Sequence, residues 1–262
     1  MLNRLGYTLK KVLKTKPLRK IPETDAIFEN VAKRHQQAHR DPGILRISID
    51  TKAKVKIGNL SRGGYSRMRI APEAEDHDQQ WDAIMVPLGI NELNTEQVTV
   101  IFGNSLETSD FIVDGLEMWW HMRKAELDHY EKIMIDLDNG KALAGNTKRF
   151  IKRMVSFAKM INKPIHLVYY PPYHSKYNAV ERVWAALENY WRGMILDTIP
   201  NTLKIAAQMT WKGSHPIIHL MDKVYEKGLP APTRNELNEL QRFIIRNPKL
   251  KKWDIQISPF PI

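Results

Sequence analysis

The chain has 262 residues, enough for one large domain or for one domain with an appendage. Its 43% hydrophobic and 26% charged residues are typical of a soluble globular protein, and the absence of cysteine excludes disulfide frameworks and thiolate metal sites. No apolar run approaches the roughly 20 residues of a transmembrane helix, and the basic N-terminus lacks the apolar centre of a secretory signal. We therefore expect a cytoplasmic protein.

The net charge of +11 is concentrated near the N-terminus. Residues 1–40 contain ten Lys or Arg and three acids, a net charge of +7, whereas the other 222 residues contain 30 and 26, a net charge of +4. A basic arm on a nearly neutral body indicates a polyanionic partner, because contacts to phosphates release counterions. A solvated, frayed terminus is the alternative. The candidate contact residues are Lys10, Lys11, Lys14, Lys16, Arg19 and Lys20.

The first half of the chain predicts one helix followed by strands. Residues 24–38 have the pattern of a capped helix. Residues 44–52, "ILRISIDTK", alternate as a strand with Asp50 near its end. Residues 53–68 predict a second strand and a Gly-Gly turn, so that the two strands would pair as a hairpin. After an acidic loop, further strands are expected at 83–90 and 96–103.

The second half alternates helices and strands. Helical periodicity covers 107–127, 147–161 and 175–191, and strands are expected at 132–140 and 164–170. The first of these helices should bury Phe111, Leu116, Trp119 and Trp120. Ser175 would cap the last helix and Gly193 would end it. Apolar periodicity beyond residue 200 also predicts helices, so the fold class is mixed α/β with a helical C-terminal part.

Three carboxylates occupy positions where acids are costly. Asp50 and Asp138 end strands, and Glu181 is expected in the second turn of the helix that follows Pro171-Pro172. Carboxylates that converge at one sheet edge raise one another's pKa unless a cation neutralises them. Two Mg²⁺ ions roughly 4 Å apart would do so and would suit phosphoryl transfer. The chemistry indicated is that of a nuclease or strand transferase.

Each carboxylate also has a plainer interpretation. Asp50 could be an ordinary strand-end residue, and Glu181 could be a salt-bridged surface acid beside an apolar stripe. Asp136 and Asp138 are two residues apart and therefore share a strand face, so either could be the second ligand. We prefer Asp138 because it stands at the strand end.

Four segments together resemble the catalytic domain of bacterial insertion-sequence transposases, in the ISAzo-type group related to mariner-like DDE transposases. They are "ISIDTKAKVKIGNLSRGG", "VTVIFGNSLETSDFIVDGLEMWW", "IDLDNG" and "YYPPYHSKYNAVERVWAALENYWRG", and the likeness runs from about Leu5 to about Asp254. The resemblance implies an RNase H-like fold, a mixed five-stranded sheet flanked by helices. It also implies a catalytic, metal-binding triad of Asp50, Asp138 and Glu181 that holds two Mg²⁺ or Mn²⁺ ions.

The same resemblance implies an activity and partners. The enzyme would cleave a phosphodiester at each transposon end and join the freed 3′-hydroxyl to target DNA, as a homodimer on double-stranded DNA in the bacterial cytosol and nucleoid. His174, Ser175 and Asn178 belong to the signature loop, so we expect His174 and Asn178 to contact DNA, or Asn178 to orient Glu181. Basic residues near the second aspartate could line the DNA path, although a solvated helix face explains them equally well. They are Lys141, Lys148, Arg149, Lys152 and Arg153.

The resemblance divides the chain into three parts. Residues 1–40 would be a basic arm, the remnant of a helix-turn-helix region and linker; residues 41–200 the catalytic domain; and residues 201–262 a helical extension. The N-terminal region is short for the family, so we expect an N-terminally truncated chain. In addition, "DNGKALAGNTKRF" departs from the expected "DNGPEN". The alternative function is therefore a catalytically idle DNA-binding remnant of a transposase.

Overall fold

The computed structural model describes residues 2–5, 8, 20–77 and 80–262. Between residues 109 and 191, helices and strands alternate as the sequence predicts. The strands are β1 (Ile44–Thr51), β2 (Val55–Ile57), β3 (Ala83–Glu92), β4 (Val98–Gly103), β5 (Lys132–Leu137), β6 (Ile165–Tyr169), β7 (Ile217–Met221), β8 (Ile244–Arg246) and β9 (Asp254–Ile257). The helices are α1 (Thr24–Arg40), α2 (Ser109–Leu127), α3 (Lys148–Ile161), α4 (Val180–Trp191), α5 (Ile199–Ala207) and α6 (Arg234–Gln241), with short 3₁₀ turns η1 (Leu2–Leu5) and η2 (Ser175–Tyr177).

The strands form one mixed sheet in the order β7-β4-β3-β1-β5-β6-β9-β8, and β2 pairs with β3. β1 is parallel to β5, which is parallel to β6, whereas β3 is antiparallel to both β1 and β4. The expected count of five strands is wrong, because the sheet has nine within the described part of the chain. Five of them, β4-β3-β1-β5-β6, form its continuous centre, and β1 lies in the middle of the molecule.

The C-terminal part is not wholly helical as expected. Residues 215–228 predict a helix but contain β7, which extends the sheet beside β4. Residues 233–245 also predict a helix, and they contain α6 followed by the beginning of β8. β9 then pairs with both β6 and β8. Apolar runs of five residues or fewer fit a strand and a helix equally well. Their conformation is therefore decided by the sheet edges that they complete.

Two further local expectations are wrong. β2 pairs with β3 and not with β1, because both edges of β1 are already occupied by β3 and β5. Ser175 begins the short turn η2, and α4 starts only at Val180 with Ala179 as its N-terminal flanking residue. The helix does end near Gly193, which adopts a positive φ of 70° directly after the flanking Arg192. Glu181 consequently lies in the first turn of α4 and not in the second.

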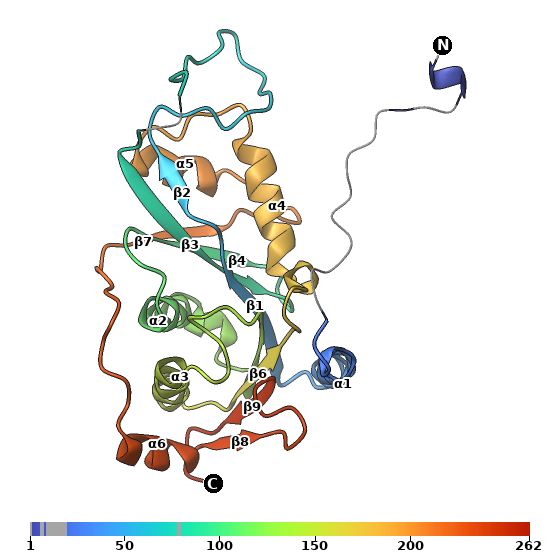
Figure 1. Cartoon of the computed structure of the whole chain (residues 1–262), viewed down its shortest axis with the longest axis vertical. Coiled ribbons are helices and arrows are strands. Elements are labelled where there is room, and N and C mark those ends of the chain that lie inside the picture. Colours follow the sequence, from blue (N-terminus) through green and yellow to red (C-terminus); the bar gives the residue numbers. More distant parts are fainter. Residues whose placement is uncertain (1, 6–7, 9–19, 78–79) are drawn as a thin grey trace.

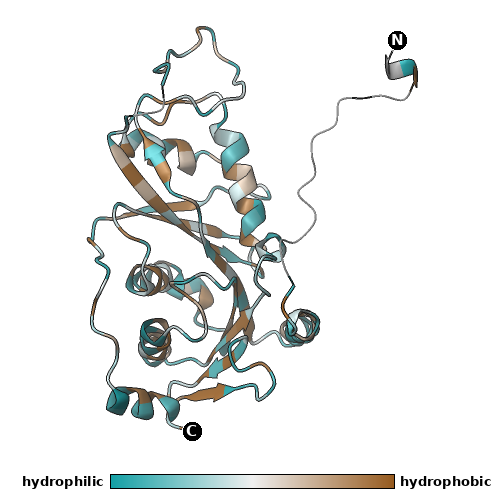
Figure 2. Cartoon of the chain, in the orientation of Figure 1, coloured by the Kyte–Doolittle hydropathy of each residue, from teal (hydrophilic) through white to brown (hydrophobic). Residues whose placement is uncertain are grey.

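Helices cover both faces of the sheet. Figure 1 places α2 and α3 on one side and α1 and α4 on the other. The predicted core residues of α2, Phe111, Leu116, Trp119 and Trp120, are all buried, and the Thr108 hydroxyl caps this helix by accepting from the Phe111 N–H at 3.1 Å. Figure 2 shows apolar residues concentrated in the strands and polar residues on α6, none of which is buried. No helix in the described residues is long and apolar enough to cross a membrane.

Helix α1 belongs to this layered structure. Ile27 and Val31 are buried in the main core, and α1 contacts β1 and β6. Residues 24–40, expected as the end of a basic arm, therefore form one wall of the sheet's second face. This wall stands beside the strand ends that carry the candidate carboxylates.

Candidate active site

The two aspartates lie at the same edge of the sheet. Asp50 is the second-last residue of β1 and is 9% exposed, and Asp138 directly follows the last residue of β5. Since β1 and β5 are parallel neighbours, their carboxyl ends meet. The backbone N–H of Gly140 donates to the Asp138 carboxylate at 3.1 Å and fixes it in the turn after the strand.

Asn178 ties the start of α4 to β1. The Ser48 hydroxyl donates to the Asn178 side-chain oxygen at 2.5 Å and accepts from the Val180 N–H at 2.9 Å. The Asn178 amide in turn donates to the Ile49 carbonyl at 2.9 Å. These bonds are buried and hold the first turn of α4 beside the end of β1. Glu181 in that turn is thereby brought to the edge that carries the two aspartates.

Gly89 lets α4 approach the sheet. It lies opposite Asp50 on β3, and a Cβ atom at this position would lie 2.6 Å from the Trp184 ring and 2.9 Å from Val180. Such distances are far below van der Waals contact, so only glycine permits this packing. Trp184 is 4% exposed and its indole Nε1 reaches no acceptor at ordinary hydrogen-bond geometry. Gly89 and Trp184 therefore set the distance between Glu181 and Asp50.

We expect Gly89→Ala to lower the free energy of unfolding by about 1–3 kcal/mol, since the new methyl overpacks the α4 interface. It should also lower DNA cleavage further than the loss of stability explains, because α4 carries Glu181. Gly115→Ala is the matched control. Its methyl would meet Leu88 at 2.4 Å on the opposite face of the sheet, away from α4. Thermal unfolding and cleavage assays on both variants check this; equal cleavage losses would contradict it.

The three carboxylates share an electrostatic environment. Burial raises the pKa of Asp50 to about 8, assisted by the charges of Asp138 and Glu181; the Thr51 N–H and the Trp184 indole act weakly in the opposite direction. Burial likewise raises the pKa of Asp138. The hydrogen bond from the Gly140 N–H lowers this pKa, and the negative charges of Glu181 and Glu107 raise it further. Carboxyls in this state bind protons or cations readily. The site therefore favours a positive charge that the described residues do not themselves supply.

Asp136, the alternative second aspartate, is engaged elsewhere. It is fully buried, and one carboxylate oxygen accepts from the Arg46 guanidinium at 2.7 and 2.9 Å. The other oxygen lies 3.1 Å from His35 Nε2. Asp136 thus joins α1, β1 and β5 through both of its oxygens. The charges that raise the pKa of Asp50 come from Asp138 and Glu181.

The donor chemistry of the site fits hard divalent cations. Its oxygens come from carboxylates, which Mg²⁺ and Mn²⁺ prefer. Within the described part of the chain, no group of three or more His, Asp or Glu side chains is arranged to hold one metal ion as it stands. Mg²⁺ commonly takes only one or two carboxylates, with substrate phosphate and water completing its shell. A pair of ions shared among Asp50, Asp138 and Glu181 is compatible with that coordination.

The residues expected to contact DNA differ in their exposure to solvent. Asn178 and His174 are 1% and 4% exposed, so neither presents its side chain to solvent. His174 bonds the Pro172 carbonyl at 2.7 Å and packs between Phe28 of α1 and Tyr177. Both residues therefore support the loop and do not offer a DNA surface. Lys20 is exposed beside Asp138, whereas Lys10, Lys11, Lys14, Lys16 and Arg19 lie outside the described residues.

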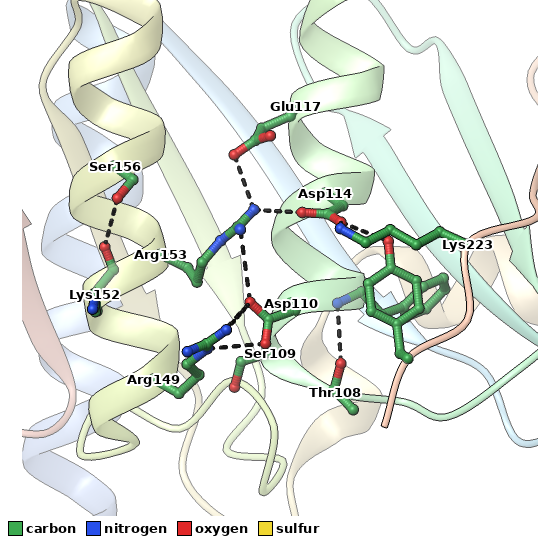
Figure 3. Close-up of polar contacts among 12 residues, drawn as sticks. Thr108, Ser109, Asp110, Asp114, Glu117, Arg149, Lys152, Arg153, Ser156 and Lys223 are labelled. Carbon is green, nitrogen blue, oxygen red and sulfur yellow. Dashed lines mark hydrogen bonds and ion pairs between the residues drawn. The ribbon is translucent and has the colours of Figure 1, made fainter. Parts of the chain in front are cut away.

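Three of the basic residues expected along a DNA path are paired within the protein. Figure 3 shows Arg149 and Arg153 of α3 directed at acids of α2. Arg149 binds Asp110 at 2.9 Å, and Arg153 binds Asp110, Asp114 and Glu117. Lys152 pairs with Glu236 of α6 at 2.5 Å. These contacts join helices on the face of the sheet opposite α4.

Sequence reasoning did not find the supporting residues Ser48, Gly89 and Trp184. In the sequence, Trp184 is one residue of an apolar stripe and Gly89 is one residue of a predicted strand. A glycine inside an otherwise apolar strand is the signal that could have indicated a close approach. Ser48 carries no such signal, because its partners are 130 residues away.

The fold is similar to that of a known DNA transposase. The Mos1 transposase paired-end complex with left transposon end matches with a TM-score of 0.51 at 10% identity, over 78% of this chain and 59% of that one. The Mos1 mariner paired-end complexes with Mn and with Mg match at TM-scores of 0.52 and 0.50 and identities of 9% and 10%, over 78% and 79% of this chain and 59% and 61% of theirs. The chain thus spans about three-fifths of the Mos1 length. At these identities the likeness shows the fold alone, a mixed sheet covered by helices.

The family follows from the sequence. The family model described as "Rhodopirellula transposase DDE domain" matches residues 1–259. The chain therefore belongs to this ISAzo-type family of transposase DDE domains. No curated protein matches it.

Proposed function

We propose that this chain is a metal-dependent polynucleotidyl transferase that cleaves phosphodiesters at transposon ends and joins the freed ends to target DNA. The observation that carries the proposal is the meeting of Asp50, Asp138 and Glu181 at the carboxyl ends of β1 and β5, where burial, assisted by the charges of Asp138 and Glu181, raises the pKa of Asp50. Family membership supports the same reaction class. The Mos1 complexes are described with transposon-end DNA and with Mn or Mg, and we extend those partners to this chain.

Asp50, Asp138 and Glu181 would hold two Mg²⁺ or Mn²⁺ ions. When bound, such ions activate the attacking oxygen and stabilise the leaving oxygen of the phosphodiester. The chain's own residues provide the frame. The Gly140 N–H orients Asp138, the bonds between Asn178 and β1 hold the turn that carries Glu181, and Trp184 and Val180 pack against Gly89, which lies opposite Asp50. A shielded site of this kind strengthens the attraction between carboxylates and cations.

Two DNA ends must be joined in this reaction, so we also propose that the chain acts as a homodimer on double-stranded DNA. Asp138 is preferred over Asp136 as the second ligand because both oxygens of Asp136 already have partners. For Asn178 we propose the role of orienting Glu181 and not that of a phosphate contact. Its side chain is 1% exposed and bonds β1 through both its oxygen and its nitrogen.

Metal removal tests the function. A supercoiled plasmid that carries the DNA flanking the coding sequence should be nicked in Mg²⁺ or Mn²⁺, and chelation by EDTA should reduce nicking to background. Gel electrophoresis of the plasmid measures the nicked fraction, and a band-shift assay measures binding. DNA binding without nicking in either metal would overturn the proposal in favour of a catalytically idle remnant.

A further inference from the structure

Two adjoining cavities lead away from Asp138. The first has a volume of about 520 Å³, within the roughly 300–1,000 Å³ of small-ligand sites. It lies between the start of α1, the turn after β5 and the loop after β6, and Asp138 forms part of its wall. The second, of about 480 Å³, shares Ile21, Pro22 and Pro172 with the first and extends to the loop between β8 and β9. Together they form a groove that begins at Asp138.

An aromatic ring stands at the first cavity. Tyr173 lines it and is 54% exposed, although its φ of 65° lies in the left-handed region that a tyrosine rarely adopts. That conformation costs on the order of 1 kcal/mol and persists only where neighbours impose it. Here they do, since the next residue, His174, is buried and packs against Phe28 of α1. The ring is thus held beside Asp138 with its surface uncovered.

The far end of the groove is basic. Lys249, Lys251 and Lys252 line the second cavity, and all three are exposed. Among the described residues, none of them forms an ion pair. Lys20 lines the first cavity and is 3.7 Å from Asp25. The floor between the two ends is made by prolines and Ile21, with the acid Glu23 beside them in the wall of the second cavity. A ligand with flat apolar groups and negative charges matches a groove that has an aromatic ring at one end and lysines at the other.

We propose that this groove is the track of a single DNA strand that continues from the phosphodiester held at Asp138. An unpaired base stacks on Tyr173, and the following phosphates contact Lys249, Lys251 and Lys252. Sites for single-stranded nucleic acid combine an aromatic platform with a positively charged groove in this way. The inference rests on the proposed function, because that function places the scissile phosphodiester at Asp138.

The test compares binding of the 262-residue chain to fluorescein-labelled oligothymidylate and to a labelled hairpin duplex, by fluorescence anisotropy in EDTA. Tyr173→Ala should weaken oligothymidylate binding roughly tenfold or more, whereas Tyr173→Phe keeps the ring and should bind as the parent does. Duplex binding should change little in either variant. Tyr173 is exposed, and equal melting temperatures would show that both variants are folded.

The lysines are tested together. Changing Lys249, Lys251 and Lys252 to alanine should weaken oligothymidylate binding and lower the dependence of log K on log salt by about two, since each single-strand phosphate contact contributes roughly 0.7. The matched control changes Lys124, Lys204 and Lys227, three exposed lysines without ion pairs among the described residues, and removes the same charge. An equal loss of oligothymidylate binding in the control variant, or unchanged binding in Tyr173→Ala, would show that the groove is not the track of a DNA strand.

Failure of this inference is distinguishable from failure of the proposed function, since binding in EDTA requires no catalysis. If the parent nicks plasmid DNA and the groove variants bind oligothymidylate as tightly as the parent does, the proposed DNA track is wrong and the proposed function still stands. If the parent never nicks DNA but the groove variants lose oligothymidylate binding, the result supports the groove as a single-strand binding site and contradicts the proposed catalytic function.

Discussion

Replacing Asp138 or Glu181 with alanine is expected to abolish metal-dependent DNA nicking. A catalytic metal contributes several kcal/mol to transition-state stabilisation, so loss of a ligand should reduce the rate by about a thousandfold or more. The change should leave the fold intact, because each carboxylate is partly exposed and neither forms an ion pair among the described residues. Nicking rates and melting temperatures of the two variants provide the measurement.

Asp136→Asn is the matched control for the second aspartate. It weakens the buried contact with Arg46 and His35, so the melting temperature should fall. At a temperature where the variant remains folded, nicking should persist within a few-fold of the parent rate. The reverse pattern, in which Asp136→Asn loses nicking and Asp138→Ala keeps it, would show that the second ligand is Asp136.

The second large expected effect concerns stability, pH and metal at Asp50. A carboxyl whose pKa is raised from 3.8 to about 8 on folding binds its proton more tightly in the folded protein. The free energy of unfolding contributed by this group is therefore highest in acid and falls as the pH rises from about 4 to about 8. Asp50→Asn removes this dependence. In metal-free buffer, the stability of the variant relative to the parent should increase by up to about 1.4 kcal/mol per pH unit across that window.

Divalent metal should reverse the effect. Mg²⁺ or Mn²⁺ neutralises the ionised carboxylates, so it should raise the melting temperature of the parent more at pH 8 than at pH 5 and should have little effect on Asp50→Asn. Thermal unfolding across pH, with and without metal, measures both responses. A constant stability difference between the two proteins from pH 5 to pH 8 would argue against a raised pKa at Asp50.

Much of the fold is predictable because its central elements are local in origin. The alternation of β1 and the apolar runs of β5 and β6 are readable from a few neighbouring residues, as are the periodicities of α2 and α3. β7 and β8 are not, since short apolar segments become strands only when β4 and β9 offer them an edge. For the same reason the pairing of β2 with β3 could not be foreseen: it depends on which edge of β1 is already taken.

For the site, the sequence by itself determined which acids stand at strand ends, Asp50 and Asp138, and its signature segment singled out Glu181. Only the tertiary structure shows that both oxygens of Asp136 are already bonded, because its partners, Arg46 and His35, come from other elements. It also turned Asn178 from an expected DNA contact into a buried tether to β1. The physical reason is the sequence separation of the interacting residues. Backbone periodicity is set by residues two to four positions apart, whereas the partner of a buried polar side chain is chosen by packing across the whole chain.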